Sequence, residues 1–256
     1  MTADGGSAFT LERPPVTQVN LTVAFNAAPP IQGWHLADLY STLRTRYLSV
    51  SESAPVPARN EDERYEFLPA GGSWPIARTE FARTDGSLAV QGDLIDVVWD
   101  FGHGEGSNKY VGFDSLVAEM GQVYGEFVEA LSKNGVELEP RMAECRYVND
   151  IVGLSGPELA VGVLTAWASV EPRPVAAPGY VGVRMHACAS TEHRCSSWVM
   201  VDADDDEPPK LTLRVNRRVS EADADAIEAL REAHDELIEL FRRHTSDALR
   251  KGWGEQ

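Results

Sequence analysis

The chain has 256 residues, and its 23 Lys and Arg against 40 Asp and Glu give a formal net charge of −17. This charge repels phosphate backbones, which argues against direct nucleic-acid binding, and it suits a basic partner protein or simply solubility. No apolar run reaches the roughly 18 residues of a membrane span, the start MTADGGSAFT has no signal-peptide pattern, and three scattered cysteines form no disulfide framework. We therefore expect a cytoplasmic protein with no membrane partner.

The first half of the chain begins with an amphipathic strand. Residues 1–13 are expected to be disordered, and in PPVTQVNLTVAFN, residues 14–26, apolar side chains take every second position. This alternation predicts a strand with one wet face. A helical spacing follows over residues 34–48, and a polar, proline-bearing loop is expected over 49–62. Further elements are short strands near residues 65–68, 76–83, 87–90 and 93–101 and a long amphipathic helix over about 113–133.

The second half repeats this order of elements. The expected elements are a strand over residues 136–151, a helix over 157–168, strands over 180–188, 195–201 and 210–215, and a long terminal helix with its N-cap at Ser220. The sequence thus predicts an α+β fold in which two pseudo-equivalent strand-helix-strands-long helix units, residues 14–134 and 135–256, form a curved antiparallel sheet covered by the long helices. Whether these halves are one compact domain or two tightly packed subdomains stays open.

Several stretches occur in an order that we associate with a known family. They are PPVTQVNLTVAF, VQGDLIDVVWDF, Tyr110 with Phe113, ECRYVNDI, and a C-terminal set of Leu230, His234, Phe241, Thr245, Asp247, Leu249 and Arg250. From about residue 14 to 254 the chain resembles a sporadically distributed, largely uncharacterised family of prokaryotic proteins. The resemblance implies no reaction and no residue roles. A scattered distribution is similar to that of mobile, defence-linked or toxin-neutralising genes.

The stretch Arg146-Tyr147-Val148-Asn149 contains the first candidate site residues. On a strand, Arg146 faces one side while Tyr147 and Asn149 face the other. An arginine in the middle of a covered sheet needs a carboxylate or carbonyl partner. Arg146, Tyr147 and Asn149 therefore either tie the two halves together or hold an anionic ligand, and both interpretations remain open.

A second candidate site is a cluster of His and Cys. His186, Cys188, His193 and Cys195 fall within ten positions, and zinc accepts this ligand set in a tetrahedron. Only one residue separates His186 from Cys188, which departs from the usual zinc spacing, so a plain hairpin with small and polar side chains is the alternative. Zinc is the one cofactor that the sequence suggests.

No nucleophile elbow and no His-Glu-x-x-His motif occurs, so no catalytic residue is predicted. The glycine-rich segment 102–109 and the acidic segment 202–207 match neither a P-loop nor a calcium loop and are interpreted as connections. We expect a non-enzymatic acidic protein-interaction factor, of the antitoxin, immunity or phage-defence accessory kind, with a basic protein or a toxin as partner and a homodimer as a further option. The alternative is a small-molecule-binding protein or an enzyme with a cavity between the sheet and the long helices.

Overall fold

The computed structural model describes residues 9–56, 58–59, 65–66, 76–100, 110–168, 179–187, 195–204, 207–219 and 225–255. Up to residue 132 the elements are β1 (Val16–Ala28), η1 (Gly33–Leu36), α1 (Ala37–Leu43), β2 (Ser49–Ser53), β3 (Ala58–Arg59), β4 (Tyr65–Glu66), β5 (Arg78–Arg83), β6 (Gly86–Val90), β7 (Leu94–Asp100) and α2 (Phe113–Ser132). The later elements are β8 (Glu137–Asp150), α3 (Gly156–Leu164), β9 (Tyr180–Ala187), β10 (Cys195–Asp204), β11 (Lys210–Arg218), α4 (Ala226–His244) and α5 (Asp247–Gly252).

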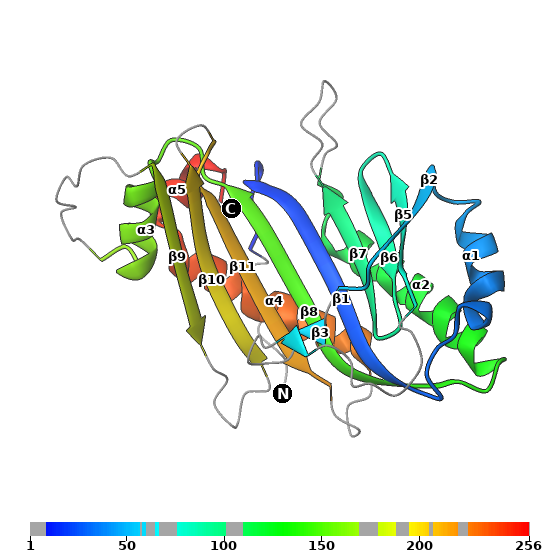
Figure 1. Ribbon diagram of the computed structural model, residues 1–256. Coiled ribbons are helices and arrows are strands. Elements are labelled where there is room, and N and C mark those ends of the chain that lie inside the picture. Colours follow the sequence, from blue (N-terminus) through cyan, green and yellow to red (C-terminus); the bar gives the residue numbers. More distant parts are fainter. Residues whose placement is uncertain are drawn as a thin grey trace, which may run out of the picture.

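A large antiparallel sheet forms the frame of this α+β fold (Figure 1). In the described residues it has nine strands in the order β2-β5-β6-β7-β1-β8-β11-β10-β9, and β3 and β4 form a separate small sheet. Every neighbouring pair in the large sheet is antiparallel. The first strand of each half, β1 or β8, lies at the centre, and the later strands of that half extend outward from it.

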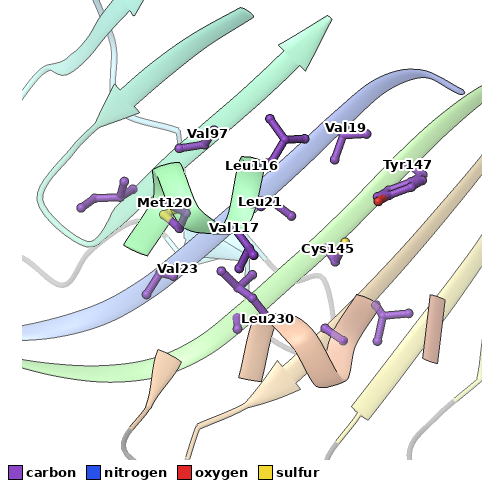
Figure 2. Close-up of a cluster of buried hydrophobic side chains, with 14 of the residues drawn as sticks. Val19, Leu21, Val23, Val97, Leu116, Val117, Met120, Cys145, Tyr147 and Leu230 are labelled. Carbon is purple, nitrogen blue, oxygen red and sulfur yellow. The ribbon is translucent and has the colours of Figure 1, made fainter. Parts of the chain in front are cut away.

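The two long helices, α2 and α4, lie against one face of this sheet (Figure 1). The apolar side chains of β1 face them, as the alternation predicts, and Val19, Leu21 and Val23 have no exposed surface. Figure 2 shows the core on this side of the sheet, which includes Val19, Leu21, Val23, Val97, Leu116, Val117, Met120, Cys145, Tyr147 and Leu230. Burying one such large apolar side chain stabilises the fold by about 1.5–3 kcal/mol, so this layer holds the helices on the sheet. We call the opposite side of the sheet the polar face.

Most of the expected elements are present, with local differences. Residues 49–53 form the edge strand β2 instead of the expected loop, because they pair with β5. Their side chains are all exposed and show no apolar alternation, so the sequence pattern did not indicate a strand. The helix expected over residues 34–48 is a short 3₁₀ turn followed by α1, which ends at Leu43. The N-cap of α4 is Asp225, whose Oδ1 accepts the backbone N–H groups of residues 227 and 228 at 2.9 and 3.2 Å, whereas Ser220 lies outside the described residues.

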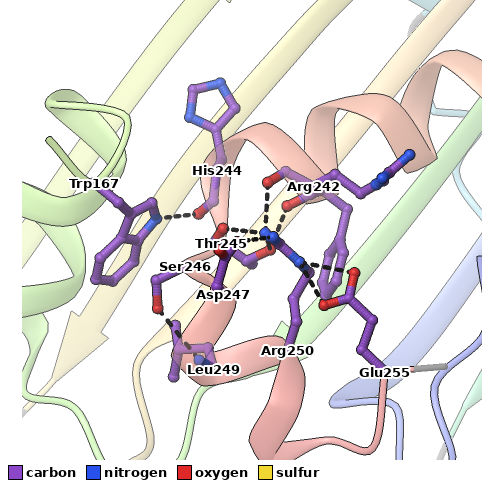
Figure 3. Close-up of polar contacts among 10 residues, drawn as sticks. Trp167, Arg242, His244, Thr245, Ser246, Asp247, Leu249, Arg250 and Glu255 are labelled. Carbon is purple, nitrogen blue, oxygen red and sulfur yellow. Dashed lines mark hydrogen bonds and ion pairs between the residues drawn. The ribbon is translucent and has the colours of Figure 1, made fainter.

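The C-terminal segment is held by a network of polar contacts (Figure 3). Trp167, which follows α3, donates its Nε1–H to the carbonyl oxygen of His244 at 2.8 Å. The guanidinium of Arg250 donates to the carbonyl oxygen of Thr245 and forms an ion pair with Glu255 at 3.1 Å. These bonds satisfy carbonyl groups at the end of α4 that have no partner inside the helix, and they join α3, α4 and α5.

The N-terminus differs from the disorder that the sequence predicts. In the described residues 9–13, the backbone N–H of Arg13 donates to the carbonyl oxygen of Trp253 at 3.0 Å, and the ring of Phe9 packs against α4. The two ends of the described chain therefore lie together, and residues 1–8 are outside the description. No helix in the described ranges is both long and apolar enough to cross a membrane.

Candidate functional site

Strand β8 separates the three residues of the first candidate site onto two faces. Tyr147 lies in the core, where its hydroxyl is 2.8 Å from that of Tyr110. Asn149, with 1% of its surface exposed, donates from Nδ2 to the carbonyl oxygen of Leu211 at 3.0 Å. Arg146 lines a hollow on the polar face. The predicted alternation is therefore confirmed, and only Arg146 is placed where a ligand can reach it.

Burial of the two core tyrosines affects their protonation. Desolvation raises the pKa of Tyr147 well above its usual value, and it raises the pKa of Tyr110 as well. Both hydroxyls therefore keep their protons at neutral pH and act as hydrogen-bond partners of each other. This is the behaviour of a structural contact in the core.

The hollow around Arg146 has a volume of about 180 Å³. Its walls come from β1, β5, β7 and β8 and from a residue that follows β2, and they consist of Asn20, Thr22, Ala24, Val56, Arg78, Leu94, Asp96, Arg141, Met142, Glu144 and Arg146. On β1 and β7 these are the side chains that alternate with the core residues. The register of β1 with β8 shifts between Ala24 and Phe25, which leaves Arg141 between two paired positions. This shift brings both Arg141 and Met142 to the hollow.

The carboxylates of the hollow are already bound by neighbouring side chains. Asp96 Oδ2 lies 2.6 Å from a guanidinium nitrogen of Arg78, and Asp96 Oδ1 accepts the hydroxyl of Thr22 at 2.6 Å. Glu144 lies 3.9 Å from Nε of Arg214, which is adjacent on β11, and the side chains of this pair are only 7% and 4% exposed. Both carboxylates are thus directed to arginines of the protein.

The charge around the hollow differs in sign from that of the whole chain. The charged side chains that line it are Arg78, Arg141, Arg146, Asp96 and Glu144. Three positive and two negative groups give the described lining a net charge of +1, within a chain of net charge −17. The centre of the polar face is therefore locally basic.

Several buried polar atoms on the polar face have no hydrogen-bond partner within the described chain. They are Oδ1 of Asn20, Nε of Arg141, and both amide atoms of Asn216, which is 3% exposed. Asn216 stands opposite Glu144 in the β8–β11 register. Buried polar groups in folded proteins are almost always satisfied by protein, water or ligand. Unsatisfied atoms gathered beside one hollow therefore indicate a place where other molecules complete the hydrogen bonds.

The polar face continues beyond the hollow as a stack of side chains on neighbouring strands. The guanidinium of Arg214 lies 3.8 Å above the ring of Trp198, and the ring of His186 is stacked on Trp198 at 4.4 Å. Trp198 is 1% exposed, so the stack is a packed part of the sheet. It fixes Arg214, and through Arg214 it orients Glu144 at the wall of the hollow.

The predicted zinc cluster falls mostly outside the described residues. His186 is in the stack with Trp198, and Cys195 begins β10, while Cys188 and His193 are among the residues that are not described. In the described part of the chain, no group of three or more His, Cys, Asp and Glu side chains is placed to hold a metal ion. Zinc binding by His186, Cys188, His193 and Cys195 remains a prediction.

Comparison with known proteins adds no further assignment. No family model matches this chain. A search of the curated proteins finds no match either. The functional proposals below therefore rest on the geometry of the hollow and of the surfaces around it.

Most residues of the hollow could not be recognised in the sequence. The alternation of β1 places Asn20 and Thr22 on the same face of that strand, and the alternation of β8 places Glu144 and Arg146 on one face of β8. Neither pattern indicates that β1 and β8 are neighbours in the sheet. Arg78 reaches the hollow only because β5 lies on the same sheet as β7 and β1. The sequence signal that did point to the hollow was Arg146, a charged residue in the middle of the long strand β8.

Proposed function

We propose that this protein is a binding protein and that the hollow of its polar face receives an anionic group contacted by Arg141 and Arg146. The observation that supports this best is the net charge of +1 on the lining of a hollow of about 180 Å³ whose walls include unsatisfied buried atoms. Guanidinium groups present planar forks of N–H donors that match carboxylate and phosphate oxygens. An anion would supply acceptors for these donors and would balance the excess charge.

The size of the hollow favours a small ligand or the end of a larger one. A single water needs roughly 10–15 Å³ and pockets for drug-sized ligands begin near 300 Å³, so a hollow of about 180 Å³ lies between the two. A phosphate or carboxylate group with a short carbon skeleton fits this range. The apolar walls at Leu94 and Met142 suit the carbon part.

Binding without catalysis is the function that the walls support. The described residues that line the hollow include no Ser, Cys, Lys, His or Tyr, and its two carboxylates, Asp96 and Glu144, face the protein's own Arg78 and Arg214. The hydroxyl of Thr22 is engaged by Asp96, whose other oxygen faces Arg78. These groups hold one another in position, which suits recognition of a charge.

A second proposal concerns the side of the molecule that faces away from the hollow. The outer surface of α4 has exposed acidic residues at Glu228, Glu232, Asp235, Glu236 and Glu239. Together with the chain's net charge of −17, this surface supports the binding of a basic partner protein, as expected of an antitoxin, immunity or phage-defence accessory factor. Co-purification of a basic protein that is lost when these five residues are changed to Gln and Asn would support this role, and unchanged recovery would contradict it.

We also propose that the two halves of the chain, residues 14–134 and 135–256, are pseudo-equivalent. In support, β1 and β8 lie together at the centre of the sheet, and the strands β7, β6, β5 and β11, β10, β9 follow outward from them in the same relative order. In each half the last strand in sequence, β7 or β11, is followed by a long helix, α2 or α4, on the same face. In this arrangement the hollow lies beside the junction of the halves, where β1 meets β8.

Thermal unfolding in the presence of small anions tests the hollow. Sulfate, phosphate and acetate are compared at constant ionic strength with the unchanged protein, with Arg146→Gln and with Arg243→Gln, an exposed arginine on α4 that serves as a control of equal charge change. A bound anion at 100 times its Kd stabilises the folded state by about 2.7 kcal/mol, which is several degrees of melting temperature. We expect this rise in the unchanged protein and in Arg243→Gln, and its loss in Arg146→Gln. Equal responses of all three proteins would contradict the proposal.

A further inference from the structure

We propose that the edge strand β2 is a docking site for an extended segment of a partner protein, which adds to the sheet as a further antiparallel strand and has the pattern basic-x-aromatic-x-aliphatic. This inference is independent of the hollow and goes beyond the binding of an anion. The evidence comes from the open edge of β2, the groove beside it and the side chains that β2 directs into that groove.

Strand β2 has an open edge. It is the last strand of the large sheet in the described chain, where it pairs with β5, and Figure 1 shows it next to α1. All five of its residues are exposed, so the strand is accessible from solvent. Backbone N–H and C=O groups along such an edge point outward and can pair with another chain. An extended backbone is therefore the ligand that this edge recognises.

A groove of about 550 Å³ lies beside this edge, on the helix-covered side of the sheet. The rings of Tyr40 and Tyr47 pack against that of Phe81, with centroids 5.4 and 5.9 Å away. The groove is lined by Tyr40, Ser41, Arg44, Tyr47, Leu48, Ser49, Val50, Glu52, Thr79 and Phe81. Its volume is within the range of about 300–1,000 Å³ of ligand pockets, which gives room for large side chains of a bound segment.

Alternate residues at this edge direct their side chains into the groove. Leu48, Val50 and Glu52 all line it, as expected for strand residues two apart, which lie on one face. Leu48 is 75% exposed and Val50 is 41% exposed, so both offer apolar surface to a partner. A strand added alongside β2 places every second side chain next to these three, on the same face. In an antiparallel strand the neighbour of Glu52 comes first and that of Leu48 last.

These three positions specify the residues of the partner. Glu52 is the one charged residue of β2 and the chain has a net charge of −17, so its neighbour is Lys or Arg. The neighbour of Val50 reaches over it to the aromatic rings of the groove, which favours an aromatic side chain. An aliphatic residue covers the exposed surface of Leu48. Arg44 also lines the groove, but it follows α1 and is not in the row of side chains that the added strand meets.

The length and sequence of this edge favour a peptide segment over a second copy of the chain. Five strand residues span about 17 Å, whereas a stable interface buries about 800 Å² on each partner. Two-fold pairing of β2 with itself places Glu52 opposite Val50 when it is centred on Ser51, and opposite Leu48 when it is centred on Val50. Both registers set a carboxylate against an apolar side chain. A segment with a basic residue at that position avoids this mismatch.

Fluorescence anisotropy with the labelled synthetic peptide Gly-Lys-Thr-Phe-Thr-Leu-Gly tests the inference. We expect saturable binding to the unchanged protein, at least about tenfold weaker when Phe is replaced by Ala and about fivefold weaker when Lys is replaced by Glu. A peptide methylated at its three central backbone nitrogens keeps the side chains but loses the backbone donors. It is expected not to bind, because strand addition depends on main-chain hydrogen bonds.

Three protein variants assign the contacts, with folding checked by circular dichroism. Glu52→Lys is expected to reverse the preference, so that the peptide with Glu binds more tightly than the peptide with Lys. Glu137→Lys, an equal charge change at an exposed position at the start of β8, is the matched control and is expected to keep the original preference. Leu48→Ala, at an exposed position, is expected to weaken the binding of the original peptide by about threefold.

Each contrary outcome removes a defined part of the inference. Equal affinity for the methylated and the original peptide would overturn strand addition. An unchanged preference for the Lys peptide in Glu52→Lys would overturn the assignment of the basic residue. A dimer of the unchanged protein in light scattering that Ser51→Pro dissociates would overturn the choice of a peptide in favour of a second copy. The absence of binding by every peptide would overturn the docking site itself.

Discussion

The hydroxyl pair of Tyr110 and Tyr147 gives a sharp test of how the core is built. The two oxygens lie 2.8 Å apart, and Tyr147 is only 7% exposed. Tyr147→Phe removes one hydroxyl and leaves the other buried without its partner, at a cost of about 1–3 kcal/mol. Tyr110→Phe likewise leaves the hydroxyl of Tyr147 buried without its partner, at a similar cost in stability. The double variant removes both polar groups, so it loses only the net hydrogen bond, which contributes about 1 kcal/mol.

The two single changes are therefore expected to be strongly non-additive, with a coupling free energy of about 1 kcal/mol or more. Urea denaturation followed by circular dichroism gives the free energy of unfolding of each variant by linear extrapolation. Tyr180→Phe, at a position that is 60% exposed on the edge strand β9, is the matched control and is expected to change stability by less than about 0.5 kcal/mol. Additive losses from the two single variants would refute the proposed contact.

Three further predictions follow from the helices. Leu230→Ala on α4 removes a fully buried side chain and is expected to lower the free energy of unfolding by about 2–5 kcal/mol, whereas Leu164→Ala, at a position 57% exposed, is expected to change it little in the same denaturation assay. Asp225→Ala removes the N-cap of α4 and is expected to cost about 0.5–2 kcal/mol, with Asp225→Asn retaining most of the stability. Burial lowers the pKa of His234, so as the pH falls this imidazole is protonated in the unfolded chain before it is protonated in the folded protein. The free energy of unfolding is therefore expected to decrease from about pH 7 down to the folded pKa and then to level off. Thermal melting at each pH is expected to show a weaker pH dependence in His234→Phe.

The alternation of apolar residues on β1 was enough to predict which side of the strand faces the helices. A one-residue error in register would expose Val19, Leu21 and Val23, so the burial of these side chains fixes the face strongly. The same reasoning on β8 separated Arg146 from Tyr147. Signals of this kind succeed because they depend only on the strand period and on the burial of apolar surface.

Other features depend on contacts that are distant in sequence. Strand β2 is fully exposed along one edge, so its pattern SVSES differs little from that of a loop, and it becomes a strand by pairing with β5. Likewise the pair of Arg78 and Asp96 joins β5 and β7, which are not hydrogen-bonded neighbours, and no local pattern predicts that they meet. The hollow is a product of strand order, which the sequence does not show directly.

Side-chain NMR of arginine provides the most direct test of the central claim, that Arg141 and Arg146 hold an anion on the polar face. Nε–Hε signals of the ¹⁵N-labelled protein are assigned with single Arg→Lys variants and then followed during titration with inorganic phosphate. The Arg141 and Arg146 signals are predicted to move in a saturable way with a common Kd, while the Arg243 signal stays in place. Saturable movement at arginines outside the hollow, with those two unchanged, would contradict the account.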